Sequence, residues 1–148
     1  MFTTIVVGLD GSEPAEKALT VACDLARTYD AHLHLVHTPQ PKTVAFALGA
    51  VSGYHTATTM PSPDEVTRAG QKVLDAGCKI AATFGFDDPA VHQAQGDAAQ
   101  VITEYAKACN ADLIVTGRRG LGAVGALVQG STTQQVNHFA TCACLSVV

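Results

Sequence analysis

The chain has 148 residues, of which 47% are hydrophobic and 15% charged, and its formal net charge is -4. This composition is typical of one compact globular domain and excludes a disordered chain. The acidic balance argues against non-specific binding to nucleic acid, which requires a basic face. The apolar runs are too short to span a membrane. Five cysteines without framework spacing, and no visible signal peptide, lead us to expect a cytoplasmic protein with free thiols.

The first expected strand covers residues 5–9 and is apolar on both faces, as in the middle of a parallel sheet. It ends at Asp10-Gly11-Ser12, where Ser12 is the expected N-cap of a helix and Pro14 suits its first turn. The apolar residues that follow recur at helical spacing, at Ala15, Ala18, Leu19, Ala22, Leu25 and Ala26.

A second strand is expected over residues 31–37, closed by Pro39. His32 and His34 share one face and could bind a metal, but no carboxylate or cysteine lies nearby in the sequence, so we interpret them as structural. Residues 40–63 show no clear periodicity. We interpret them as a long connection with a short helix near residues 44–48, acting as a lid or contact surface.

The second half of the chain continues to alternate. Ser62 predicts a helix start, because Pro63 suits the first position and Glu65 completes a capping box. A weak third strand, a helix, a fourth strand, a further helix and a last strand are then expected over residues 90–94, 98–110, 112–116, 131–140 and 144–148, with Asp97 and Ser131 as the helix caps.

This alternation predicts a single α/β domain over residues 1–148, with a parallel sheet covered by helices on both faces. In such sheets, ligands bind beyond the carboxyl ends of the strands, where the strand order reverses. If the order is 3-2-1-4-5, the first and fourth strands are neighbours at that point. The polar loops that follow them would then open onto one crevice.

The loop after the fourth strand, residues 116–131, is rich in glycine. Gly117, Gly120 and Gly130 would let backbone N–H groups approach an anion. The helix that follows adds free N–H groups and a positive dipole end, and Arg118 adds charge. The stretch is neither a P-loop nor a dinucleotide fingerprint. The alternative interpretation is a flexible surface loop.

Each polar group near this crevice suggests a role. The hydroxyls of Ser131, Thr132 and Thr133 would donate to phosphates. Asp10 could accept from a ribose hydroxyl or hold Mg²⁺ through water, although it could also only stabilise the helix start. Residues 36–38 would line an apolar slot for a base.

The spacing Gly117-x2-Gly120-x9-Gly130-Ser131 is similar to the G-x2-G-x9-G-[ST] signature of ATP-binding universal stress proteins. Residues 5–12, 35–37, 96–97 and 111–117 also resemble conserved blocks of that family, so the resemblance covers nearly the whole chain. Only residues 40–63 fall outside it, in a region that varies in the family. The resemblance implies a small cytoplasmic stress-response protein with a Rossmann-like, adenine nucleotide alpha hydrolase-like fold and a five-stranded parallel sheet in the order 3-2-1-4-5.

The resemblance also implies a ligand, ATP or AMP, and a homodimer formed through residues 144–148. The residues implied to surround the nucleotide are Gly8, Leu9, Asp10, Thr38, Thr116, Gly117, Arg118, Gly120, Gly130, Ser131, Thr132 and Thr133. The chain departs from the family at Thr38, where valine is usual, and at Ala143, where proline is usual. The first departure makes the base slot more polar, and the second bears on the dimer edge.

Two functions stay open at this point. A nucleotide-dependent switch or sensor is favoured, because hydrolysis needs an oriented water and no clear catalytic base is evident near the phosphates. The alternative is a weak ATPase or an autophosphorylating enzyme that uses Ser131 or a nearby threonine. A phosphoacceptor receiver domain is a more distant interpretation, because Asp97 suits a helix cap better than an acceptor.

Overall fold

The computed structural model describes residues 1–40, 61–119 and 130–148. The predicted short helix near residues 44–48 and the predicted site residue Gly120 lie outside these ranges. Within them, strands and helices alternate in the order β1 (Thr4–Leu9), α1 (Glu13–Tyr29), β2 (His32–His37), α3 (Pro63–Thr83), β3 (Ala90–Gln93), α4 (Ala98–Ala108), β4 (Leu113–Gly117), α5 (Ser131–Phe139) and β5 (Ala143–Val147).

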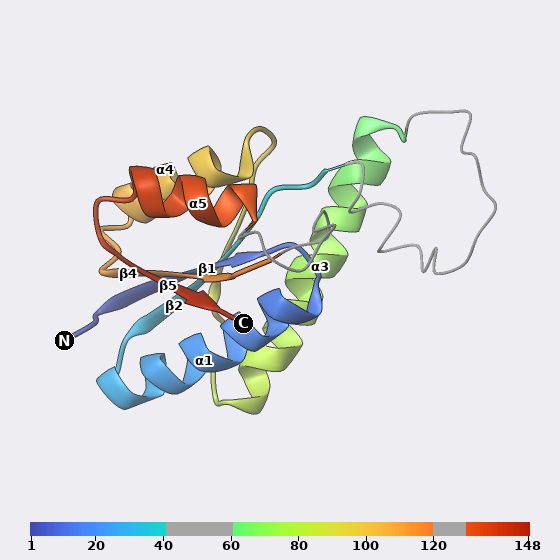
Figure 1. Ribbon diagram of the computed structural model, residues 1–148. Helices are drawn as coiled ribbons and strands as arrows, with labels where there is room; N and C mark the ends of the chain where they lie inside the picture. Colours follow the sequence, from blue (N-terminus) through green and yellow to red (C-terminus); the bar gives the residue numbers. More distant parts are fainter. Residues whose placement is uncertain (41–60, 120–129) are drawn as a thin grey trace.

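The strands form one five-stranded sheet in the order β3-β2-β1-β4-β5, and every paired neighbour runs parallel. This confirms the predicted fold class and strand order. Helices α1 and α3 lie on one face of the sheet, and α4 and α5 lie on the other (Figure 1). None of the described helices combines the length and the apolar character that crossing a bilayer requires.

Strand β1 runs through the centre of the molecule because both of its faces are apolar. Ile5, Val6 and Val7 are all 0% exposed. Ile5 and Val7 belong to the core beneath α1 and α3, whereas Val6 belongs to the core beneath α4 and α5. The alternation of side chains along a strand therefore supplies two hydrophobic cores from one short apolar run.

The predicted helix caps are confirmed at two positions. The Ser62 hydroxyl accepts from the backbone N–H of Glu65, and the Glu65 carboxylate accepts from the backbone N–H of Ser62, which completes the capping box. Asp97 accepts from the backbone N–H of Gln100 at 2.9 Å. Both caps satisfy N–H groups that a first helical turn leaves without partners.

Helix α5 differs from its prediction by one residue, because its N-cap is Gly130 and not Ser131. Gly130 has the extended backbone of a cap (φ -59°, ψ 143°), and its carbonyl accepts from Gln134 N at 3.1 Å. Ser131 is therefore the first residue inside the helix. The fourth and last strands are likewise displaced by one residue from the expected ranges, so that Gly117 is the last residue of β4.

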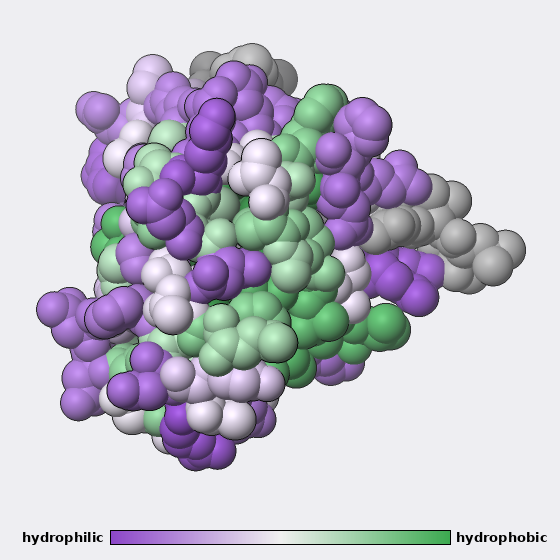
Figure 2. Space-filling view, turned by 90° about the vertical axis from the view of Figure 1, so that its left-hand side faces the viewer, coloured by the Kyte–Doolittle hydropathy of each residue, from purple (hydrophilic) through white to green (hydrophobic). Residues whose placement is uncertain are grey.

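The amino-terminal edge of the sheet is held by polar and aromatic contacts. Asp112 Oδ2 accepts from the backbone N–H of Thr3 at 2.7 Å and from that of Thr4 at 3.0 Å, which ties the start of β4 to the start of β1. The rings of Phe2 and Tyr29 meet edge to face nearby, with centroids 5.2 Å apart. Figure 2 looks onto this side of the molecule and shows apolar residues gathered over part of it.

Candidate functional site

The carboxyl-terminal edge of the sheet brings the predicted loops together. Gly8 pairs with Thr116 of β4, and Leu9 pairs with His37 of β2. The chain that leaves β1 at Asp10 therefore lies between the ends of its two neighbouring strands. Because β1 and β4 sit where the strand order reverses, this is the position at which open parallel sheets bind ligands.

Asp10 is held in place by the residue that was expected to cap α1. The backbone N–H and the hydroxyl of Ser12 both donate to Asp10 Oδ1, at 2.9 and 2.5 Å. Ser12 occupies the N-cap position, but its side chain makes no capping hydrogen bond. The Ser12 hydroxyl is bonded to the Asp10 carboxylate, which it orients, and not to a backbone N–H of the helix.

The start of α5 is fixed against the end of β4. Gly130 N donates to Arg118 O at 2.9 Å, and the Thr133 hydroxyl donates to Gly117 O at 2.8 Å. Thr133 is buried, and its proton is directed to the protein backbone. Ser131 is exposed and Thr132 is partly exposed, so their hydroxyls lie at the surface of the helix start.

Two of the predicted glycines have a packing role that needs no ligand. A Cβ atom on Gly117 would lie 2.8 Å from the Pro14 carbonyl carbon and 2.9 Å from Ala15 N. A Cβ atom on Gly8 would lie 2.7 Å from Ile102 Cδ1. Both distances are shorter than van der Waals contact. Glycine at these positions is explained by the close approach of α1 and α4 to the sheet.

The end of β2 carries two buried polar residues. Thr38 is 6% exposed, and its hydroxyl has no hydrogen-bond partner among the described residues. A buried hydroxyl without a partner is costly, which makes it a candidate for bonding to a ligand. His37 is 1% exposed and its Nδ1 lies 2.7 Å from Leu9 O. Sequence reasoning placed His37 only within the stretch 36–38 that would line a slot for the base, and it did not predict the contact with Leu9, although a histidine sharing a strand face with Leu33 and Leu35 was a usable signal.

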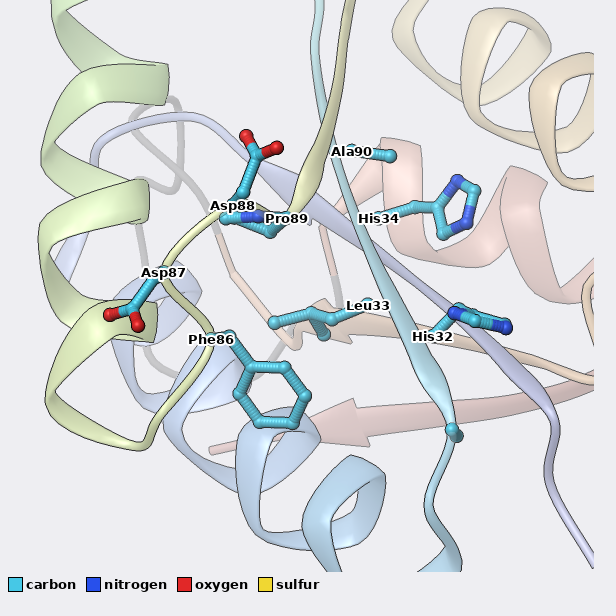
Figure 3. A pocket seen from close by; sticks show the side chains of 9 residues that line it. His32, Leu33, His34, Phe86, Asp87, Asp88, Pro89 and Ala90 are labelled. Atoms are coloured by element: carbon cyan, nitrogen blue, oxygen red, sulfur yellow. The ribbon is translucent and has the colours of Figure 1, made fainter.

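A pocket of about 330 Å³ lies at the opposite end of the strands, where β2 and β3 begin. It is lined by Ala31, His32, Leu33, His34, Phe86, Asp87, Asp88, Pro89 and Ala90, none of which is a predicted site residue. The imidazoles of His32 and His34 point to one side and the Asp87 carboxylate points to the other (Figure 3). These side chains do not converge on a common point, so the pocket offers no catalytic or metal-binding arrangement.

His34 makes its own contact outside that pocket. Its Nδ1 lies 3.0 Å from the Tyr105 hydroxyl of α4. Burial lowers the pKa of His34, and the neighbouring His32 lowers it further. Within residues 1–40, 61–119 and 130–148, no three His, Cys, Asp or Glu side chains come together as metal ligands.

Comparisons with known proteins agree with this fold. The model of the universal stress protein family matches residues 1–147. The chain is 30% identical over 148 residues to universal stress protein YxiE of Bacillus subtilis (strain 168), and 99% of each is covered. Universal stress protein UspA from Lactobacillus plantarum has a TM-score of 0.76 and 26% identity, covering 99% of this chain and 97% of that chain. A universal stress protein crystallised with cAMP has a TM-score of 0.71 and 25% identity, with 99% and 97% covered. The chain belongs to the universal stress protein family.

Proposed function

We propose that this protein binds an adenine nucleotide, ATP or AMP, at the carboxyl edge of its sheet and acts as a nucleotide-dependent switch or sensor. The observation that carries the proposal is the meeting of three elements there. The oriented carboxylate of Asp10 follows β1, the start of α5 is held against β4, and the unpartnered Thr38 hydroxyl ends β2. The cAMP complex of a related universal stress protein supports this class of ligand.

The chemistry of each element suits one part of a nucleotide. The first turn of α5 presents backbone N–H groups and the positive end of the helix dipole, which favour phosphate. The hydroxyls of Ser131 and Thr132 and the charge of Arg118 lie at the same place and would add to this attraction. Asp10 would accept a hydrogen bond from the ribose or hold Mg²⁺ through water. Thr38 would contact the base.

A switch is favoured over an enzyme because the Asp10 carboxylate and the Thr133 hydroxyl are already engaged with the protein. Asp10 Oδ1 accepts two hydrogen bonds from Ser12, and the Thr133 hydroxyl donates to Gly117 O. Such groups can recognise a fixed ligand. Proton abstraction from water requires a base within reach of that water, and Asp10 is better arranged to orient a ribose than to move a proton.

The proposal is tested by mass spectrometry of the purified protein and by calorimetry with ATP, AMP and cAMP. We expect adenine nucleotide to co-purify and at least one of these ligands to bind. Absence of bound nucleotide, together with no calorimetric signal at millimolar ligand, would contradict the proposal. Phosphate release from ATP above that of an Asp10→Ala variant would instead support the enzymatic alternative.

Gly130→Ala is the informative site variant. The backbone angles of Gly130 are accessible to alanine, so the change adds a methyl group without straining the chain. We expect binding to weaken by about tenfold or more, which corresponds to about 1.4 kcal/mol, with an unchanged circular dichroism spectrum. Gln135→Ala, an exposed change on the same helix, should leave affinity unaltered and serves as the control.

Gly117→Ala would not serve this purpose. Its methyl group would meet the backbone of Pro14 and Ala15. Overpacking of this kind costs about 1–3 kcal/mol of stability, so weaker binding by that variant would not identify a phosphate contact.

We also propose that two copies associate through β5, whose second edge has no strand beside it in the described sheet.

A further inference from the structure

His37 links the end of β2 to the end of β1 through its side chain. The imidazole is buried, with 1% exposure, and Nδ1 lies 2.7 Å from the carbonyl oxygen of Leu9. A carbonyl oxygen only accepts, so Nδ1 must carry the proton. Burial lowers the pKa of His37, whereas the bond to Leu9 and the charge of Asp10 raise it less strongly. The ring is therefore neutral near pH 7, with Nε2 as a bare acceptor.

The hydrogen bond from His37 acts on the peptide group that precedes Asp10. Leu9 is the last residue of β1, and its carbonyl belongs to the peptide plane that joins it to Asp10. Helix α3 packs closely against the Leu9 side chain, since a Cβ atom on Gly77 would lie only 2.6 Å from Leu9 Cδ1. On the other side, Ser12 holds the Asp10 carboxylate. Asp10 is therefore held at two points: the peptide group that precedes it is held by His37, and its side chain is held by Ser12.

A packing role alone does not explain why this buried position holds a histidine. Its Nε2 is buried and has no hydrogen-bond partner in the described part of the chain. An aliphatic side chain would fill the space without leaving a buried nitrogen unsatisfied. The bond to Leu9 O is what the imidazole supplies and an aliphatic residue cannot.

We propose that His37 is a positioning residue for the nucleotide site, which acts through the Leu9 carbonyl to aim Asp10 at the ligand. The neutral ring with its proton on Nδ1 is the form that does so. This inference rests on the proposed function, because Asp10 must contact the nucleotide for its orientation to matter. The role that we assign to His37 is exerted through Leu9 O and requires no contact between the imidazole and the ligand.

A double-mutant cycle with Asp10 separates positioning from a merely structural role. ATP affinity is measured for the natural protein, His37→Leu, Asp10→Ala and the double variant. We expect His37→Leu to weaken binding about tenfold, as supporting partners of ligating groups do, but by less than about twofold where Asp10 is already alanine. An equal loss in both backgrounds, or no loss in either, would overturn the inference.

The conservative variant His37→Asn provides the rescue. Its amide N–H can reach the position of Nδ1 and donate to Leu9 O, so it should recover most of the affinity that His37→Leu loses. Asparagine binding as weakly as leucine would count against positioning. If the natural protein binds no nucleotide, the proposed function fails. If it binds and His37→Leu binds equally well, only this inference fails.

A spectroscopic measurement tests the tautomer that the inference requires, and it needs no variant. Nitrogen-15 NMR of histidine-labelled natural protein distinguishes the two neutral tautomers. We expect the proton of His37 on Nδ1 at pH 7. A ring protonated on Nε2 alone could not donate to Leu9, and the inference would be wrong.

Discussion

Individual residues at the strand ends serve the fold and the candidate site together. Gly117 was predicted to let a phosphate approach, and the structure shows that it lets α1 approach. Thr133 was predicted to donate to a phosphate, and its hydroxyl donates to Gly117 O. Both contacts join segments that lie far apart in the sequence, so no local pattern encodes them. The proposed ligand contacts therefore rest on the side chains of Asp10, Thr38 and Ser131, which these two corrections leave unchanged.

Asp112 predicts how stability responds to acid. The Thr3 hydroxyl, together with the backbone N–H groups of Thr3 and Thr4, holds the pKa of the Asp112 carboxyl below its ordinary value of 3.8. A lowered folded pKa means that these bonds stabilise the protein above the unfolded pKa and are lost as pH falls through the folded one. Urea unfolding between about pH 5 and about pH 3 should therefore show a steeper loss for the natural protein than for Asp112→Asn. Parallel losses would contradict this assignment.

For the helices and strands, the sequence was most informative where a side chain makes its hydrogen bond to a residue close by in the sequence. The capping box at Ser62 and the cap at Asp97 were predictable because they join residues three apart. The start of α5 was misplaced because serine is usually the better cap, whereas Gly130 has the extended backbone of the cap and its carbonyl accepts from Gln134 N. The N–H of Gly130 also donates to Arg118 O, a contact between distant residues that a local cap preference does not reveal.

The cap of α3 gives a prediction for that helix. Ser62→Ala removes the hydroxyl that accepts from Glu65 N and that donates to the Glu65 carboxylate. We expect the free energy of unfolding to fall by about 1 kcal/mol, measured by urea denaturation. Ser62→Thr keeps the hydroxyl and should retain most of this stability. If threonine and alanine destabilise equally, the hydroxyl is not the cause.

For the molecule as a whole, the alternation of strands and helices predicted a parallel sheet, because parallel strands need crossovers and crossovers have one hand. The strand order 3-2-1-4-5 was implied by the family resemblance and is the order that the structure shows. The position of the candidate site followed from that order. What alternation cannot predict is which side chains meet beyond the strand ends. The hydrogen bond between His37 and Leu9 O is such a contact, because the two residues are brought together only by the pairing register of β1 and β2.

The proposed dimer predicts the behaviour of a proline in β5. Ala143 N donates to Asp112 O, and Val147 O accepts from Arg118 N. Backbone groups alternate along a strand, so those of Ser146 face the open edge. Ser146→Pro removes an N–H that a second copy would need while sparing the bonds to β4. Light scattering should show a dimer for the natural protein and for Ser146→Ala, and a monomer for Ser146→Pro. A natural protein that is monomeric would contradict the proposed association.

The hydrogen bond from Arg118 N to Val147 O also has a practical consequence for experiments. It places the end of β5 beside Arg118, one of the candidate phosphate contacts, whereas the first residues of the chain lie at the opposite, amino-terminal end of the strands (Figure 1). A purification tag or fluorophore fused after Val148 would crowd both the candidate site and the open strand edge. The same label fused before Met1 would report on binding from a distance, without competing for either surface.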